Sequence, residues 1–440
     1  MVPRFLGVSL LFGLTSGCGG ETAEARDQWT VVITTDAPTP QFGDRLIVEV
    51  LDTAGRPACS GCRRQLGVPD VWPISFGVVP KAAGGLRLRA RLYRASIAGP
   101  DGLPSGSALI DATGSFPGAT GITPAHLHLT MNCFGQPAEV GSARSCDPET
   151  ASFGPEPVLR APPSELPESG SWPPAQPRPC SGATPPGMVC VPGGAFLLGN
   201  AAALDDQGLP ERLVRLSPFF IDADEFSVGA LRELVSTGVV DPPTPPNLPG
   251  ASEVCTFTAS GEANAGMPVN CIDFFNAERA CAAVGKRLPT EAELEFVAGN
   301  LTRETTYPWG EGGDFCRHLV AGRGRIEYAE STFCMETGKE VPGPVAGGHP
   351  GDVTELGVRN LAGNLYEFAA DQFALYSASC WSGPVPLEDP RCDAVTAARA
   401  TRGTSWATQP LGAKAFERGG VSNPSGRSPE GGFRCVRGAE

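Results

Sequence analysis

The stretch GKRLPTEAELEF, Gly285 to Phe296, has the pattern of a capped helix start. Thr290 and Glu293 have the S/T-x-x-E spacing of a capping box, in which the two side chains close the start of a helix. Glu291 and Glu293 then lie near the positive end of the helix dipole. The pattern predicts a helix that begins after Thr290 and ends at Gly299. We interpret these glutamates as helix-starting residues and not as a catalytic pair of carboxylates.

A second helix is predicted directly upstream, in DFFNAERACAAVG. Asp273 can cap its first turn, and Gly285 can end it in the left-handed conformation. One face of this helix is apolar and carries Phe274, Ala277, Cys281 and Val284.

Further blocks surround these helices in a fixed order. They are MVCVPGGAFLLGN (Met188–Asn200), SPFFIDADEFSVGALRELV (Ser217–Val235), YPWG (Tyr307–Gly310), GVRNLAGNLYEFAAD (Gly357–Asp371), RGTSW (Arg402–Trp406) and GGFRCVRG (Gly431–Gly438). Together with GKRLPTEAELEF, the set resembles the formylglycine-generating, sulfatase-modifying-factor domain family from about Met188 to Gly438. Leu294 stands where that family usually has tryptophan. The resemblance implies a C-type-lectin-like α+β fold with little regular secondary structure.

The rest of the chain predicts export and a second domain. Phe5 to Leu14 is an apolar stretch too short to span a bilayer, and it leads into LTSGC, which resembles a bacterial lipobox ending at Cys18. We therefore expect residues 1–18 to be a lipoprotein signal, with Cys18 lipidated and the protein membrane-anchored at the bacterial cell envelope; ordinary signal cleavage is the alternative.

Residues 27–133 alternate apolar and polar residues, which predicts an antiparallel, Ig-like β-sandwich. Residues 134–180 form a Pro-rich linker, and residues 181–440 the family domain.

Three arginines alternate with apolar residues in one predicted strand of the sandwich. Leu88, Ala90 and their neighbours face one side, and Arg87, Arg89 and Arg91 the other. We interpret the arginines as a solvated strand face. The formal net charge of the chain, −14, argues against nucleic acid as a partner.

Cysteine usage indicates an oxidising compartment, since fourteen of the fifteen cysteines remain once Cys18 is set aside. The family resemblance implies a disulfide between Cys281 and Cys435. Neighbouring cysteines suggest the pairs Cys316–Cys334, Cys380–Cys392, Cys255–Cys271, Cys180–Cys190 and Cys133–Cys146. Cys59 and Cys62, in CSGC, are interpreted as a loop disulfide; half of a zinc site or a redox pair are the alternatives.

The chemistry of the family is not matched by this sequence. Formylglycine generators hold copper with two cysteines just after the G-G-S-[WY] block, because soft thiolates select Cu(I). The corresponding run here, Thr404 to Gly420, contains no cysteine. Copper is therefore not expected, and no catalytic residue is assigned. The related iron-dependent branch needs a histidine-rich site, whereas this chain has four histidines.

Two binding sites are expected from the resemblance. NLAGNLYE keeps a calcium-loop spacing in which Asn360, Gly363, Leu365 and Glu367 would offer oxygen ligands to Ca²⁺; a tight turn held by Asn360 and Asn364 is the alternative. The family's substrate groove would be lined by Trp406, Phe416 and Arg418, with Tyr307 and Trp309 near it.

The sequence thus favours an exported lipoprotein whose family domain is a non-catalytic binding or structural module. Its ligand would be a protein, a peptide or a glycan. The alternative is an enzyme, a formylglycine-generating oxidase or related oxidoreductase acting on a protein cysteine.

Overall fold

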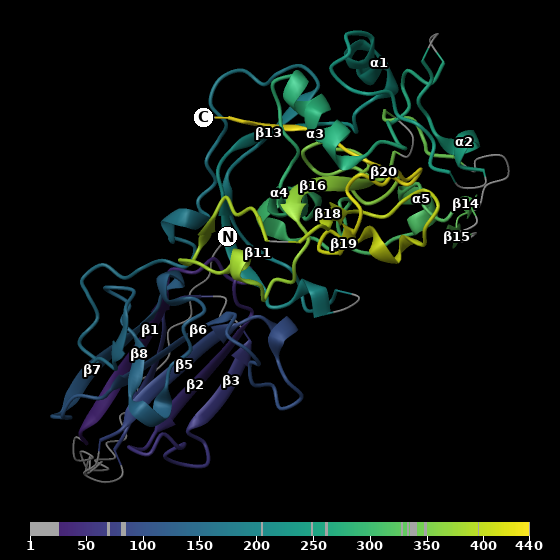
Figure 1. Ribbon diagram of the computed structural model, residues 1–440. Helices are drawn as coiled ribbons and strands as arrows, with labels where there is room; N and C mark the ends of the chain where they lie inside the picture. The colour runs from purple at the N-terminus through teal and green to yellow at the C-terminus, as the bar shows by residue number, and fades with distance from the viewer. Residues whose placement is uncertain are drawn as a thin grey trace, which may run out of the picture.

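The computed structural model describes residues 26–67, 71–80, 85–203, 206–247, 250–259, 263–326, 329–331, 334, 341–346, 350–394 and 396–439. Figure 1 shows two parts, an N-terminal part built of strands and a C-terminal part that mixes short helices with strands. Among the described residues, no helix has the length and apolar character needed to cross a bilayer.

Two sheets that share one hydrophobic core build the N-terminal part. One sheet has the order β4-β1-β7 and the other the order β3-β2-β5-β6. The bounds are β1 Gln28–Thr35, β2 Arg45–Leu51, β3 Arg63–Gly67, β4 Ile74–Val78, β5 Arg87–Tyr93, β6 Leu109–Ser115 and β7 Ile122–Leu129. The sheets are not wholly antiparallel, because β1 and β7 pair in parallel. The chain leaves β6 in one sheet and enters β7 in the other, running in the same direction as β1.

The arginines of β5 are not a solvated face. They form ion pairs with three carboxylates: Arg87 with Glu156 at 2.5 Å, Arg89 with Asp111 at 2.6 Å and Arg91 with Glu49 at 2.8 Å. The alternation was predicted correctly, but the neighbouring strands β2 and β6 bring Glu49 and Asp111 beside the guanidinium groups. The polar face of β5 is therefore covered by ion pairs.

The Pro-rich segment 134–180 is folded and is not simply an extended linker. It contains the hairpin of β8 (Arg144–Cys146) and β9 (Phe153–Pro155). Trp172 is buried in the N-terminal core, and its indole N–H donates to Oδ1 of Asn132 at 2.9 Å. The apolar and hydrogen-bonding groups spread through this segment have no helical or strand periodicity, which is why the pattern did not predict their packing.

In the part of the C-terminal region that the structure describes, there are five α-helices and several short strands. The helices are α1 Val228–Ser236, α2 Ala251–Val254, α3 Phe274–Ala283, α4 Glu291–Ala298 and α5 Phe315–His318. The strands are β10 Met188–Val191, β11 Gly194–Leu198, β12 Arg212–Leu216, β13 Phe219–Asp222, β14 Gly324–Ile326, β15 Ala329–Ser331, β16 Tyr366–Gln372, β17 Leu387–Glu388, β18 Arg399–Arg402, β19 Arg418–Val421, β20 Gly431–Gly432 and β21 Val436–Gly438. The four-stranded sheet β19-β18-β16-β20 lies at its centre, beside α4 (Figure 1).

The two helices expected from the sequence are present with their caps. Asp273 accepts a hydrogen bond from the backbone N–H of Asn276 at the start of α3, and Gly285 follows that helix with φ of 71°. Thr290 and Glu293 form the complete capping box of α4. The glutamates of this stretch therefore begin a helix, as predicted.

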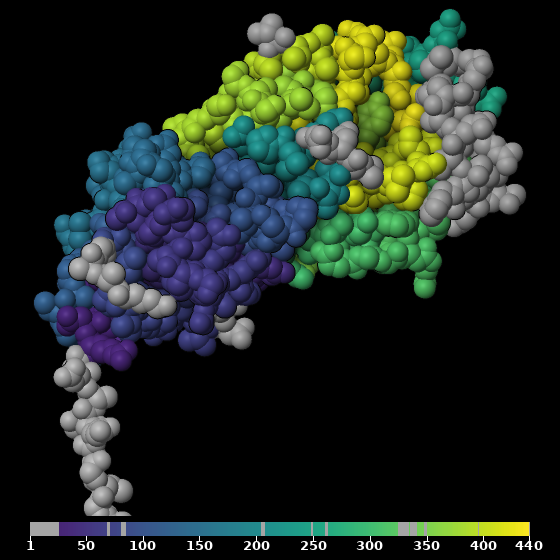
Figure 2. All heavy atoms as spheres, turned by 90° about the horizontal axis from the view of Figure 1, so that it is seen from below, coloured from purple at the N-terminus to yellow at the C-terminus, as the bar shows by residue number. Residues whose placement is uncertain are grey.

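The sheet β11-β12-β17 separates the two parts and belongs to both. Ala195 and Leu197 of β11 pack into the N-terminal core, whereas Phe196 and Leu198 pack into the C-terminal core. The spheres of the two parts accordingly form one continuous body in Figure 2. Arg94 adds a charge contact across this boundary, 2.7 Å from Glu304.

The structure contains seven disulfides, and they match the pairing expected from the sequence. Cys281 of α3 bonds to Cys435 next to the last strand, with an S–S distance of 2.01 Å. The other six are Cys59–Cys62, Cys133–Cys146, Cys180–Cys190, Cys255–Cys271, Cys316–Cys334 and Cys380–Cys392. Cys18 lies outside the described residues.

Candidate functional site

The run Thr404 to Gly420 leaves β18, forms a short 3-10 turn at Pro410–Ala413 and returns as β19. Its first part holds a network of hydroxyl groups. Oγ1 of Thr408 lies 2.7 Å from Oγ1 of Thr404 and 3.0 Å from Oγ of Ser405. Ser405 in turn donates to Oε2 of Glu430 at 2.6 Å, and burial raises the pKa of this carboxyl group. The segment that carries thiolates in the family carries hydroxyl groups here.

Trp406 is completely enclosed, with an exposed fraction of 0%. Its indole N–H donates to the carbonyl of Pro429 at 3.0 Å, and its ring packs with Val320 and Leu365. Phe416 is also buried, at 6% exposure. Neither ring presents a face to solvent in this structure, so a ligand contact at these two residues is not supported by their exposure.

Arg418 is held in a buried network of charges. Its guanidinium group pairs with Glu291 through two hydrogen bonds, of 2.6 and 2.7 Å, and lies over the ring of Tyr376. Arg402 makes a parallel pair with Glu295 at 2.7 Å and donates to the Tyr376 hydroxyl at 2.6 Å. Burial would raise the pKa of Glu291, but Arg402 and Arg418 outweigh it, and the pKa lies below its ordinary value.

This network gives a second role to the glutamates of the opening stretch. The capping pattern identified Glu291 as a residue of the first helical turn, but it carried no information about arginines more than one hundred positions away. Two arginines neutralise two glutamates in the network, so it has the composition of a structural ion-pair cluster. Arg418, expected in the substrate groove, is part of this interior.

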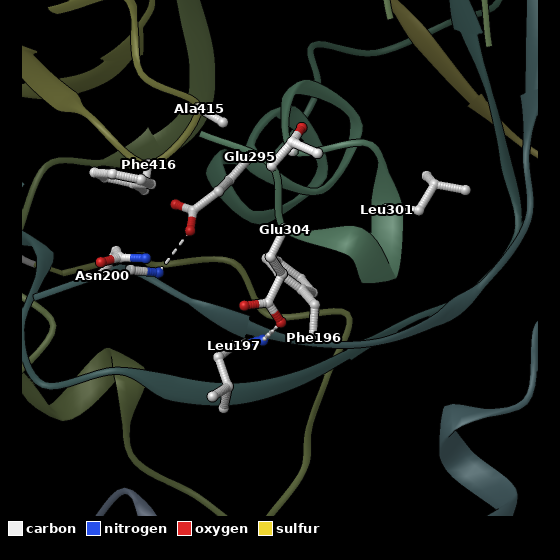
Figure 3. A pocket seen from close by; sticks show the side chains of 11 residues that line it. Phe196, Leu197, Asn200, Glu295, Leu301, Glu304, Ala415 and Phe416 are labelled. Carbon is white, nitrogen blue, oxygen red and sulfur yellow. Dashed lines mark hydrogen bonds between the residues drawn. The ribbon is translucent and has the colours of Figure 1, made fainter. Parts of the chain in front are cut away.

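A small cavity lies between β11 and the end of α4, and Figure 3 shows two carboxylates pointing into it. Glu295 accepts a hydrogen bond from the backbone N–H of Gly199 at 2.6 Å, and Glu304 accepts one from Leu197 at 3.0 Å. The cavity measures about 10 Å³, which is room for a single water molecule. We therefore assign these carboxylates to structure and not to substrate binding.

The NLAGNLYE loop folds around a buried glutamate from another segment. Asn360 and Asn364 both adopt the left-handed conformation, with φ of 59° and 71°. Their side-chain amides donate to the carboxylate of Glu225 at 2.8 and 2.9 Å. Burial raises the pKa of Glu225 well above its ordinary value, and the nearby Glu367 adds to this effect. The asparagines thus tie this loop to Glu225, and both have the left-handed backbone found in tight turns.

The other members of the predicted calcium set also have partners in the protein. Both carboxylate oxygens of Glu367 accept from Arg434, at 2.6 to 2.9 Å, and both side chains are buried. The backbone N–H of Gly363 donates to Asp352 at 2.9 Å, and the Leu365 side chain is buried. In this structure both oxygens of the Glu367 carboxylate are bonded to Arg434. Calcium binding there stays a prediction for a metal measurement.

A cluster of aromatic rings lies beside the Thr404–Gly420 run. Trp309 stacks between Tyr307 and His318, with centroid distances of 4.9 and 4.8 Å, and Phe315 meets Tyr307 edge-on. These rings are half-buried and pack with Ala413 of the 3-10 turn. Tyr307 and Trp309 were expected near a groove lined by Trp406, Phe416 and Arg418; in the structure they pack with Ala413 of the same run.

One apolar side chain at the tip of the same turn is exposed. Leu411 precedes Ala413 by two residues and has 57% of its surface in solvent. We call Tyr307, Trp309, Phe315 and His318, together with Leu411 of the adjoining turn, the aromatic patch. The sequence signal for it was the YPWG block, which the family pattern marked without showing what it contacts.

Comparison with known proteins gives a matching family and several similar proteins. Residues 174–439 match the family model described as a sulfatase-modifying factor enzyme 1-like domain. A formylglycine-generating enzyme of Thermomonospora curvata is 28% identical over 57% of this chain and 93% of its own length. An inactive C-alpha-formylglycine-generating enzyme 2 of Bos taurus is 29% identical over 39% of this chain and 51% of its own. The solved structure of PvdO from Pseudomonas aeruginosa matches at 23% identity and a TM-score of 0.45, over 60% of this chain and 98% of that protein.

Proposed function

Because the chain belongs to the sulfatase-modifying factor enzyme 1-like family, we propose that it is an exported, lipid-anchored envelope protein whose family domain is a non-catalytic binding module. One observation carries this proposal. The seven disulfides use fourteen of the fifteen cysteines, and the fifteenth is Cys18, in the segment expected to be the export signal. Soft thiolates select Cu(I), and no described cysteine is free to supply one.

Export is supported by the same disulfides. Disulfides form and persist outside the cytoplasm, and seven of them in one chain are typical of an extracytoplasmic protein. The lipid anchor rests on the sequence around Cys18 alone. Mass spectrometry of the native protein would test it: a diacylglyceryl mass on an N-terminal Cys18 is expected, and an unmodified N-terminus would refute the anchor.

The aromatic patch is the surface that we propose for ligand binding. Trp406 and Arg418 are enclosed, whereas the patch is half-exposed and lies next to the same run. Loops on a rigid core are the usual place for recognition in such a fold. The ligand would be a protein, a peptide or a glycan, since flat aromatic rings suit apolar side chains and sugar faces alike.

The test of the non-catalytic role is a pair of measurements on residues 19–440 folded under oxidising conditions. Metal content is measured before and after mild chelation, and oxygen uptake is followed with a cysteine-containing sulfatase-type peptide. The formylglycine-generating enzyme of Thermomonospora curvata serves as the positive control. No stoichiometric copper and no peptide-dependent oxygen uptake are the expected results; calcium is read in the same assay.

The alternative function is that of a formylglycine-generating oxidase, favoured by the similarity to the Thermomonospora curvata enzyme. Stoichiometric copper together with peptide-dependent oxygen uptake would establish it and overturn the proposal above.

The binding role has its own test. Trp309→Ala combined with Leu411→Ala should abolish capture of envelope proteins or glycans by the immobilised protein. Leu375→Ala is the matched control, because Leu375 is exposed to a similar extent, at 50%, outside the patch. Equal capture by the patch variant and the control would refute the role of the patch.

A further inference from the structure

The Cys59–Cys62 disulfide differs from the other disulfides in its exposure. It lies in the loop between β2 and β3, and both of its cysteines are half-exposed. Five of the other six contain at least one buried cysteine. Cys180–Cys190 is the exception, with both cysteines half-exposed. Access by an external thiol is therefore easiest at these two sites.

The ring that Cys59–Cys62 closes is also the smallest in the protein. Its cysteines are three positions apart, whereas those of the remaining six are 10 to 154 positions apart. A short ring restricts the unfolded chain least, so opening it should leave the fold intact. A disulfide that contributes little to the fold and is open to solvent is suited to exchange.

A cavity of about 430 Å³ adjoins this disulfide, and Gly61 and Cys62 line part of it. It lies between β3 and β4, each of which is the edge strand of one of the two sheets. The other side chains in its lining are mainly apolar and include Val50, Leu66 and Phe76. A volume of this size is typical of ligand sites.

The shape and edges of the cavity favour an extended polypeptide as occupant. Edge strands leave backbone N–H and C=O groups unpaired, and an added strand can pair with them. The apolar lining between the two edges would take the side chains on one face of such a strand.

An arginine also lines this cavity. Arg63 is paired with Glu49 at 2.6 Å, but Arg64 lines the cavity and has no ion pair within the described residues. A cationic side chain near a cysteine favours the thiolate form. Arg64 is thus complementary in charge to the thiolate that would attack this disulfide.

We propose that Cys59–Cys62 is an exchangeable disulfide that oxidises a pair of cysteines in an extended, apolar polypeptide bound in this cavity. A thiolate of the client attacks one sulfur, which breaks the Cys59–Cys62 bond and forms a mixed disulfide. The second client thiol, after losing its proton, displaces that sulfur. The client leaves with a new disulfide, and Cys59 and Cys62 remain as two thiols, having gained two electrons and two protons. This activity belongs to the N-terminal part and does not depend on the function proposed for the family domain.

The test follows a single turnover. The oxidised chain from residue 19 is mixed with a reduced synthetic peptide that carries two cysteines flanked by valine and phenylalanine. Samples are quenched with an alkylating reagent and mapped by mass spectrometry. We expect one peptide disulfide for each protein molecule, with the label on Cys59 and Cys62. Label on Cys180 and Cys190 at a similar rate would overturn the proposal, because that pair matches in exposure but does not line the cavity.

Variants separate the chemistry from the docking. Cys59→Ser with Cys62→Ser should abolish oxidation of the peptide. Leu66→Asp should slow the reaction with the apolar peptide by at least about tenfold while leaving the reaction with dithiothreitol unchanged. Ile122→Asp is the control, since Ile122 is an exposed residue of the same part that does not line the cavity. Equal rates for Leu66→Asp and Ile122→Asp would refute docking in the cavity.

Discussion

Replacing Arg434 by methionine tests whether the loop around Glu367 is held by an internal ion pair. The Arg434 guanidinium is fully buried and bonds to both oxygens of Glu367. It also donates to the backbone carbonyls of Arg359, Asp222 and Ala223. Methionine has a similar length but no charge and no donor, so Arg434→Met leaves a buried carboxylate and three carbonyls without their partner.

The expected loss in the free energy of unfolding is about 3–5 kcal/mol for the uncompensated carboxylate. The carbonyls add to this loss, by roughly 1 kcal/mol each where water does not replace the donor. Adding Glu367→Leu to Arg434→Met removes the unpaired charge, so the double variant should regain at least about 2 kcal/mol. It should stay below the wild type, because the carbonyls remain unsatisfied.

Urea unfolding followed by tryptophan fluorescence measures these differences, since Trp381 and Trp406 are buried in the C-terminal part. Each variant is measured with calcium and with a chelator. Stability of Arg434→Met within about 1 kcal/mol of the wild type, or a double variant no more stable than the single one, would refute the ion-pair reasoning. Rescue of Arg434→Met by calcium alone would instead show that Glu367 can bind the ion.

Three further predictions concern pH, the long disulfide and the boundary between the two parts. Burial raises the pKa of Asp352 to about 7, so its contribution to stability is present at low pH and is lost as the pH rises through 7. Asp352→Asn should flatten this decline and gain up to about 4 kcal/mol at pH 8 in urea unfolding. An unchanged pH profile of the stability would contradict this prediction. Cys281→Ala with Cys435→Ala opens a ring of 154 positions and should lower the free energy of unfolding by about 5 kcal/mol, measured by urea unfolding. A loss under about 1 kcal/mol would contradict the loop-entropy argument. Arg94→Met leaves Glu304 buried without its cation and should lower the calorimetric unfolding midpoint. This loss should shrink at low pH, because burial already raises the pKa of Glu304 and the carboxyl group becomes neutral. A loss of midpoint that grows on acidification would contradict this.

The sequence predicted the elements of the fold where a local pattern defines them. The capping box at Thr290 and the N-cap at Asp273 need only a few adjacent residues, and both are present in the structure. The alternation in β5 was equally local. It could not reveal that Arg89 faces Asp111, because that contact depends on strand pairing across more than twenty positions.

The candidate site was harder to predict for the same reason. The family blocks marked Trp406 and Arg418 as functional candidates, but the sequence does not say which side of a turn is covered. The covering groups come from distant segments, namely Pro429 over Trp406 and Glu291 against Arg418. Tyr307 and Trp309 were expected near the groove from the family alone, and they pack with Ala413 of the run.

The strand β11 has a consequence for how the protein behaves at a surface. Its residues alternate between two cores, so the two parts are joined by the packing of a shared strand. A pull or a twist applied at the N-terminal part therefore passes directly into the C-terminal part. If the chain is tethered through its N-terminus, the aromatic patch can adopt only the orientations that the tether allows. The two parts then move together as one body, because they share the packing of β11.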